Sequence, residues 1–434
     1  MDKMADVLGR AGAWCGQNKY LSAIKNAFQN FMPLTIAGAI GVLWCNVLVN
    51  DQTGLGLFFK PIMALDFLNP AFQAVNFCTI SCITVGITLG IAQEIGVWNM
   101  GAERAGYIPG LVGLAAWLSV TNTSHMVEGA NEAFTGIAGN ELGATGLFTG
   151  MIIGVLSVEL FCFFEKQDAL KIKMPEQVPP GVARAFEVLV PATITLIITA
   201  CIGSACYNLT GLYLNDVIKN GIQGPLGAVG ATIPGVMIIY LVIMLFWLVG
   251  IHGNNMLSAV KEALFTPLAL ENVEKFNKGE KPTNIINMYA LQMWGEFGGS
   301  GVTIGLVIAI MIFGKREDNK AIATLSLVPG LFNINETVTF GIPMVLNPIL
   351  GIPFVVAPLI TIIIGYVLTV IGFCPVACLT VPWTTPPIVF GFLACGANVM
   401  GAVTQAILIV VSTVIYVPFL ISYEKYQNKQ AAEA

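Results

Sequence analysis

Charged residues are scarce in this chain. Only 10% of its 434 residues are Asp, Glu, Lys or Arg, whereas 56% are hydrophobic, and the mean hydropathy is +0.78. Because soluble domains carry about 25% charged residues, this composition excludes an ordinary soluble fold. The apolar runs are also too long for the alternating strands of a transmembrane barrel. The composition therefore predicts an all-α polytopic membrane protein.

Other features are missing as well. Residues 1–30 lack the short apolar core of a cleavable signal peptide, and no basic cluster suggests a nucleic-acid partner. Cysteines are present, but the pairs Cys78/Cys82 and Cys374/Cys378 have no histidine nearby to complete a metal site. We therefore expect buried, inert thiols, no bound metal and no cofactor.

Long apolar runs, by contrast, are abundant. A spanning helix needs about 20 mostly apolar residues, and clear spans of this kind lie at residues 31–50, 73–96, 106–121, 144–164, 187–208, 232–251, 300–314, 349–373 and 399–422. Three further segments, 252–298, 321–347 and 376–396, are interrupted by charged residues, Pro or Gly. Irregular backbone at membrane depth must be buried in protein or line a wet cavity, so these segments predict re-entrant hairpins or half-helices. The expected total is about ten spans.

The distribution of Lys and Arg predicts the orientation in the membrane. Basic residues gather in the loops 165–186, 261–282 and 314–320 and in the C-terminal tail, whereas 122–143 carries glutamates and no Lys or Arg. Loops rich in Lys and Arg stay in the cytoplasm. We therefore expect these basic loops and both termini to be cytoplasmic, and 122–143 to be external.

Polar chemistry is distributed unevenly along the chain. Residues 1–210 read as regular spans, and 211–229 form a Gly-rich, weakly amphipathic connector that we expect to lie along the membrane surface. Residues 230–434 hold nearly all of the unusual polar groups.

Glu336 is the most informative of these groups. It lies within residues 330–343 beside Asn333 and Asn335, in a segment that begins with glycine and ends with proline. A charge at bilayer depth costs roughly 2.5–3.5 kcal/mol on insertion scales, so such a residue is usually functional. Carriers build substrate sites near the midplane from hydrogen-bonding groups on broken helices. We therefore predict that Glu336, Asn333 and Asn335 contact a substrate.

Histidine is rare, with two in the whole chain. His252 follows a long apolar run and lies between Gly250 and Gly253, which open the backbone on both sides. Beside a buried carboxylate, a histidine can position a hydroxyl or take a proton; the alternative is a histidine that caps a helix end. His125 falls in the polar loop, where we expect a solvated side chain without a function.

Glu296 and three tryptophans complete the candidate site. Glu296 precedes a glycine block at 298–301, where a ligand contact and a hinge at the water interface are equally supported. No Lys-Ser/Thr follows the glycines, which argues against a phosphate-binding loop. Trp247, Trp294 and Trp383 lie near these polar groups in the sequence. An aromatic face can carry the apolar face of a sugar ring, or anchor a helix at the interface, so together they favour a sugar site.

Three segments carry a family resemblance: 250–253, 298–301 and 332–348. The last contains Asn-x-x-Glu-x-x-x-Phe-Gly-x-Pro, from Asn333 to Pro343, which is the specific element. With these segments the chain resembles the IIC membrane components of bacterial phosphotransferase systems, in the lactose/cellobiose/diacetylchitobiose family.

The resemblance implies a fold and an assembly. It implies about ten transmembrane helices plus two re-entrant hairpins, arranged as a homodimer. Residues 1–210 would form the dimerisation half and 230–434 the sugar-binding half. The site would use Glu336 and His252 to hold the sugar hydroxyl that is phosphorylated, with Glu296 and Asn333 as neighbouring contacts.

The resemblance also implies partners. A phosphorylated IIB component would phosphorylate the sugar as it is delivered, and IIA would supply IIB; we expect both to be separate polypeptides. The chain would be a transport subunit in a bacterial inner membrane, not an enzyme by itself. Its expected substrate is a β-linked disaccharide, and N,N′-diacetylchitobiose is the first candidate. A cellobiose or lactose IIC subunit is the alternative, and a proton-coupled symporter using Glu336 and His252 is a more distant one.

Overall fold

The computed structural model describes residues 10, 13–14, 17–51, 55–125, 134–175 and 177–433. Its contacts divide the chain into two compact units. We call the unit built from Gln17–Gly38 and Val75–Ala228 the N-terminal unit, and the unit built mainly from Ala39–Ala74 and Val229–Ala434 the C-terminal unit. Residues 39–74 thus group with the C-terminal part of the chain, although they precede most of the N-terminal unit in sequence.

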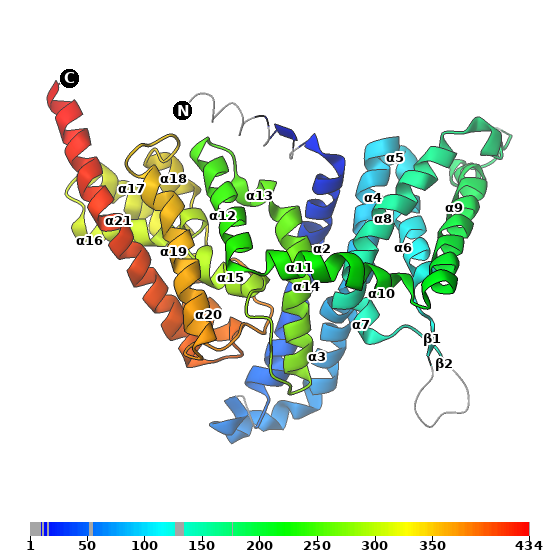
Figure 1. The fold of residues 1–434 in the computed structure, drawn as a ribbon, viewed down its shortest axis with the longest axis horizontal. Coiled ribbons are helices and arrows are strands. Elements are labelled where there is room, and N and C mark those ends of the chain that lie inside the picture. Colours follow the sequence, from blue (N-terminus) through cyan, green and yellow to red (C-terminus); the bar gives the residue numbers. More distant parts are fainter. Residues whose placement is uncertain are drawn as a thin grey trace. The chain divides into compact units, whose positions relative to one another are not determined.

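In its described residues, the N-terminal unit consists of helices, their connections and one short hairpin. The helices that begin in it are α2 (Lys19–Leu43), α4 (Ile83–Met100), α5 (Ala102–Ala105), α6 (Ile108–Val120), α7 (Gly139–Leu142), α8 (Ala144–Glu165), α9 (Pro180–Thr210), α10 (Leu214–Ile218) and α11 (Gly224–Gly230) (Figure 1). The hairpin pairs β1 (Ser124–His125) with β2 (Phe134–Thr135) in antiparallel register. Residues 126–133 of the predicted external loop lie outside the described part of the chain.

Small residues set the helix spacing in this unit. A Cβ atom at Gly113 would lie 2.3 Å from the Ala92 side chain, and one at Gly150 would lie 2.2 Å from Thr88. Such distances are too short for any larger residue, so α6 and α8 pack closely against α4. In a membrane the hydrophobic effect does not drive helices together, because lipid tails are as apolar as the side chains. Helices there associate through close packing at small residues.

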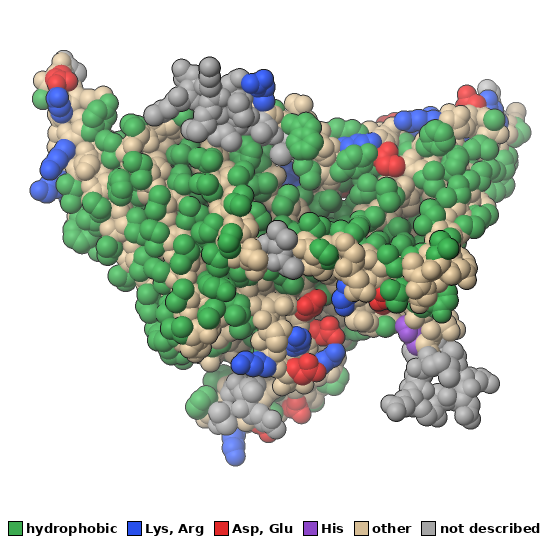
Figure 2. All heavy atoms as spheres, in the orientation of Figure 1, with side chains coloured by type: hydrophobic (Ala, Val, Ile, Leu, Met, Phe, Trp, Pro, Cys, Tyr) green, Lys and Arg blue, Asp and Glu red, His purple; other side chains and the backbone are tan. Residues whose placement is uncertain are grey.

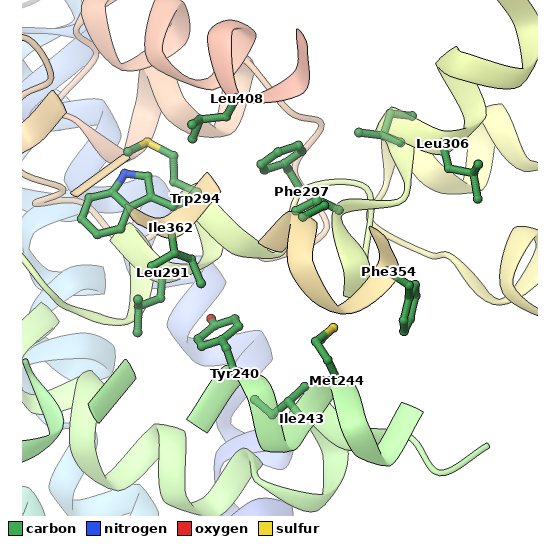
Figure 3. Packing of buried hydrophobic residues seen from close by; sticks show 14 of the residues in the cluster. Tyr240, Ile243, Met244, Leu291, Trp294, Phe297, Leu306, Phe354, Ile362 and Leu408 are labelled. Carbon is green, nitrogen blue, oxygen red and sulfur yellow. The ribbon is translucent and has the colours of Figure 1, made fainter. Parts of the chain in front are cut away.

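The C-terminal unit contains the interrupted segments. Its helices are α3 (Asn69–Asn76), which ends at the border, α12 (Ile233–Leu248), α13 (Gly253–Met256), α14 (Ser258–Asn277), α15 (Met288–Gly295), α16 (Ile304–Phe313), α17 (Glu317–Leu331), α18 (Glu336–Gly341), α19 (Gly351–Val370), α20 (Val389–Ala394) and α21 (Val399–Glu433). One apolar core joins α12, α15, α16, α19 and α21. Figure 3 shows Tyr240, Trp294, Phe297 and Phe354 within it.

Helices long and apolar enough to cross a membrane occur throughout the described residues. Five qualify singly: Lys19–Leu48, α8, α9, α19 and α21. Two bent pairs, Lys60–Ser81 with α4 and Met288–Val302 with α16, are apolar enough when each pair is taken together, as a broken span or a re-entrant loop. Helices α6 and α12 are shorter apolar helices. Apolar side chains also dominate the visible surface in Figure 2. The predicted all-α polytopic membrane fold is confirmed.

The irregular segments are only partly as expected. Residues 371–388 contain no helix, but 258–277 form the continuous helix α14, and the predicted basic loop 261–282 is mostly part of it. Residues 211–229 form the short helices α10 and α11 around a π-helical turn. Asn215 of α10 is buried and donates a hydrogen bond to the Glu141 carboxylate, so this connector is fixed to the N-terminal unit.

Candidate functional site

A break between α17 and α18 carries Glu336. Helix α17 ends at Leu331, and Asn333 then adopts a left-handed conformation with φ +63°. Asparagine tolerates this conformation better than most residues, which explains its place at the turn. The chain re-enters a helix at Glu336, the first residue of α18.

A second break, between α12 and α14, carries His252. Gly250 has φ +79°, which turns the chain after α12. His252 then caps α13, and its Nδ1 accepts a hydrogen bond from the Asn255 backbone N–H at 3.2 Å. Because Nδ1 is an acceptor, the proton of the neutral ring lies on Nε2.

These two breaks bring the histidine and the carboxylate together. His252 Nε2 lies 3.8 Å from Glu336 Oε1, and the side chains are 38% and 46% exposed. This distance is too long for a direct hydrogen bond. A hydroxyl oxygen can sit between them, where it accepts a hydrogen bond from Nε2–H and donates one to the carboxylate. The pair is thus suited to fixing one hydroxyl group.

Glu296 lies at the end of α15, whose start is fixed by Asn287. The Asn287 side chain accepts hydrogen bonds from the backbone N–H groups of residues 289 and 290. Glu296 Oε1 accepts hydrogen bonds from the Tyr240 hydroxyl at 2.7 Å and from the Lys261 ammonium group. Glu296 is therefore mostly enclosed by protein, which disfavours a hinge at the water interface.

The glycine block bends the chain after α15. Gly298, Gly299 and Gly301 have φ values of +71°, +86° and +79°, a region that side chains disfavour. The segments Met288–Val302 and α16 meet at an angle of 60° as a result.

Asn333 joins this block to a third segment. Its Oδ1 accepts a hydrogen bond from the Gly298 N–H at 2.6 Å, and its Nδ2 donates to the carbonyl oxygens of Trp383 and Thr385. The Trp383 side chain itself is 42% exposed. The structure therefore gives Asn333 a bridging role and leaves the Trp383 ring accessible.

Asn335 points into the protein. It is buried, and its Nδ2 donates hydrogen bonds to the Ser300 carbonyl at 2.8 Å and to Thr339 Oγ1 at 3.2 Å. With both amide hydrogens in use, Asn335 holds the segment before Glu336 against the glycine block.

The other two tryptophans are buried, Trp247 at 2% and Trp294 at 1% exposure. The Trp247 ring packs on the His252 ring with centroids 4.4 Å apart, so it supports the histidine. Trp294 fills the core, where a Cβ at Gly365 would lie 2.3 Å from it (Figure 3). Neither ring is exposed to stack on a sugar in this structure. His125 lies in β1 of the N-terminal unit, with Nε2 3.2 Å from the Asn122 carbonyl.

Comparisons with known proteins identify the family of the chain. The family model described as "Phosphotransferase system, EIIC" matches residues 25–358. The chain belongs to this EIIC family. It is 32% identical to the oligo-beta-mannoside-specific EIIC component of Bacillus subtilis (strain 168), over 98% of this chain and 94% of that protein. It is 30% identical to the cellobiose-specific EIIC component of Lactococcus lactis subsp. lactis (strain IL1403), over 98% of each.

A solved structure is also similar. The crystal structure of the transporter ChbC, the IIC component of an N,N′-diacetylchitobiose-specific phosphotransferase system, matches with a TM-score of 0.88 and 29% identity over 97% of each chain. As an EIIC protein, the chain is a sugar-transport subunit of a phosphotransferase system that works with IIA and IIB phosphocarrier components.

Three residues at this candidate site are absent from the prediction made from the sequence. The sequence places Lys261 in a basic loop, but in the structure this residue is buried in α14 and paired with Glu296. Tyr240 and Asn254 were not singled out, although each contacts a member of this pair. The available signal was the Lys-Glu dipeptide at 261–262, close after His252 and followed by apolar residues.

Proposed function

We propose that this EIIC subunit binds a β-linked disaccharide, with N,N′-diacetylchitobiose as the first candidate. It carries the sugar inward and presents one hydroxyl to phosphorylated IIB. The observation that carries the proposal is the half-exposed His252–Glu336 pair, in which Nε2 and Oε1 are 3.8 Å apart at two helix breaks.

The pair supports the proposal chemically. Glu336 accepts a hydrogen bond from the sugar hydroxyl, and His252 donates a hydrogen bond to the oxygen of that hydroxyl. These two bonds direct the remaining lone pair of the hydroxyl oxygen toward the phosphoryl group on IIB. The subunit itself makes no covalent bond to the sugar; its contribution is the placement of the reacting oxygen. Trp383, the exposed member of the three candidate tryptophans, is the proposed platform for a sugar face.

The choice of sugar rests on the relatives. The similar crystal structure is named for N,N′-diacetylchitobiose, and two relatives are named for cellobiose and oligo-beta-mannosides. Cellobiose and lactose remain the alternatives.

The proposal includes a location and partners. We propose a bacterial inner membrane, both termini and the basic loops in the cytoplasm, and IIA and IIB as separate chains. The charged sugar phosphate cannot readily recross the apolar core, so phosphorylation makes uptake unidirectional.

A binding panel tests the substrate. Purified protein is titrated with labelled N,N′-diacetylchitobiose, cellobiose and lactose. The tightest binding is expected for N,N′-diacetylchitobiose, and tighter binding of cellobiose or lactose would replace it as the substrate. Absence of binding to any β-linked disaccharide would contradict the proposal.

A vesicle assay tests the energy source. Vesicles that contain the phosphorelay and phosphoenolpyruvate should continue to take up the sugar after a protonophore collapses the proton gradient. Loss of uptake under these conditions would favour the proton-coupled symporter instead.

The dimer gives a separate prediction. We propose that the N-terminal part supplies the subunit contact, because α2 exposes apolar side chains such as Met32 and Leu34. In a background without native cysteines, cysteine pairs placed within 30–120 should crosslink between subunits, and pairs placed around 330–345 should not. Gly38 is a poor position, because a Cβ there would lie 2.2 Å from Thr79 of the same chain. The opposite crosslinking pattern would show that the halves have exchanged roles.

A further inference from the structure

A buried lysine lies behind the proposed sugar site. The Lys261 side chain is 7% exposed, and its ammonium group forms an ion pair with Glu296, which is 17% exposed. The same Nζ lies 3.4 Å from Asn254 Oδ1 and 5.6 Å from the centroid of the Tyr240 ring. A lysine is rarely this buried unless its charge is paired, so the pairing of Lys261 with Glu296 suggests a role for the buried lysine.

The contacts of Lys261 extend in two directions. Toward α15, it reaches Glu296, which Tyr240 also holds through its hydroxyl. Toward α13, it reaches Asn254, which lies in the same short turn as His252 and donates a hydrogen bond to Ser300 Oγ at 2.8 Å. One ammonium group thus links the His252 turn to Glu296.

The chain of contacts continues to the segment that carries Glu336. The Ser300 carbonyl accepts a hydrogen bond from Asn335 Nδ2 at 2.8 Å, and Asn335 directly precedes Glu336. A continuous series of polar contacts therefore runs from Glu296 through Lys261, Asn254 and Ser300 to Asn335. Such networks rigidify a site when every member is satisfied.

We propose that Lys261 is a positioning residue for sugar binding, which holds Glu296 as a fixed anionic acceptor and ties it to the His252 turn. This inference rests on the proposed function. The hydrogen bonds from Lys261 and Tyr240 both end on Glu296 Oε1. We expect Glu296 Oε2 to accept a hydrogen bond from the sugar. The donor would be a hydroxyl or an amide N–H, because an ionised carboxylate only accepts hydrogen bonds.

The test separates positioning from mere structural support. Lys261→Met, Glu296→Gln, the double variant, and Lys261→Arg are purified in detergent. Their melting temperatures and their affinities for labelled N,N′-diacetylchitobiose and cellobiose are measured. Lys275→Met is the matched control, because Lys275 lies on the same helix and is bonded to Thr283 at an exposed site.

Lys261→Met should lower the melting temperature and weaken sugar binding about tenfold or more, because it leaves the Glu296 carboxylate unpaired in a buried site. The double variant should recover the melting temperature but bind as weakly as Glu296→Gln, since neither charge is then left alone. Lys261→Arg should keep most of the affinity, and Lys275→Met should match the wild type.

Two results would overturn the inference. The first is an unchanged dissociation constant for folded Lys261→Met, which would make the lysine only structural. The second is wild-type affinity in the double variant. If Glu336→Gln binds sugar weakly and Lys261→Met binds it normally, only the role of Lys261 is rejected. If Glu336→Gln binds sugar normally, the proposed site and this inference are both rejected.

Discussion

Replacing Glu336 by Gln is expected to weaken disaccharide binding about 10- to 100-fold, because a hydrogen bond to a charged group contributes about 1.5–3 kcal/mol and each 1.4 kcal/mol is tenfold in affinity. Gln has the same shape, but one of its terminal groups is an NH₂ donor. The amide oxygen of Gln can still accept a hydrogen bond from a hydroxyl placed between it and His252 Nε2–H, but it carries no charge, so the bridge across the 3.8 Å gap is weaker. Transport should fall with binding, while the protein still folds.

The control for this variant is Glu274→Gln. Glu274 lies on α14, is 42% exposed, and pairs only with surface Lys278 at 2.6 Å among its ion pairs in the described residues. An exposed pair of this kind contributes little to stability, so its removal should leave binding and transport unchanged. Normal transport by Glu336→Gln would reject the central assignment of the site.

His252→Ala should reduce sugar transport at least about tenfold, because it removes the Nε2–H donor that faces Glu336. Alanine also removes the cap that Nδ1 provides for the Asn255 N–H, so lost stability alone can lower activity. His252→Asn separates the two effects. The Asn side-chain oxygen can accept the capping hydrogen bond in place of Nδ1, but nothing replaces Nε2–H.

We therefore expect His252→Asn to melt near the wild-type temperature and yet transport as poorly as His252→Ala. Uptake of labelled disaccharide and the melting temperature are the two measurements. His125→Ala is the matched control, since that histidine lies in the β1 hairpin and contacts the Asn122 carbonyl. Wild-type transport by His252→Asn would show that His252 acts only as a cap, and equal loss in His125→Ala would remove the distinction between the two histidines.

The breaks that carry the candidate site could be predicted locally. Gly250, Asn333 and the glycines of 298–301 adopt positive φ values in the structure, and these are the residue types that tolerate such a conformation. The cost of a left-handed residue depends on its own side chain, so the sequence locates these turns. It does not locate the positive φ values of Val302 (+48°) and Ile388 (+74°), which are β-branched residues that disfavour this conformation.

The burial of the tryptophans could not be predicted in the same way. Trp247 and Trp294 are buried, whereas Trp383 is 42% exposed, yet all three lie near polar groups in the sequence. In a soluble helix, the periodicity of apolar residues separates core from surface. In a membrane helix both faces are apolar, so the sequence pattern does not say which side meets protein.

By itself, the sequence determined that this protein is an all-α polytopic membrane protein, because its low charge and long apolar runs are properties of the chain that no folding changes. It also identified Glu336 and His252 as unusual, since each is a polar group at a break in an apolar region. Only the tertiary structure decided that His252 Nε2 and Glu336 Oε1 lie 3.8 Å apart, and that Lys261 is part of helix α14 and forms an ion pair with Glu296. Contacts between distant segments depend on how α12, α14, α15 and α18 pack together, and local sequence preferences carry no information about that packing.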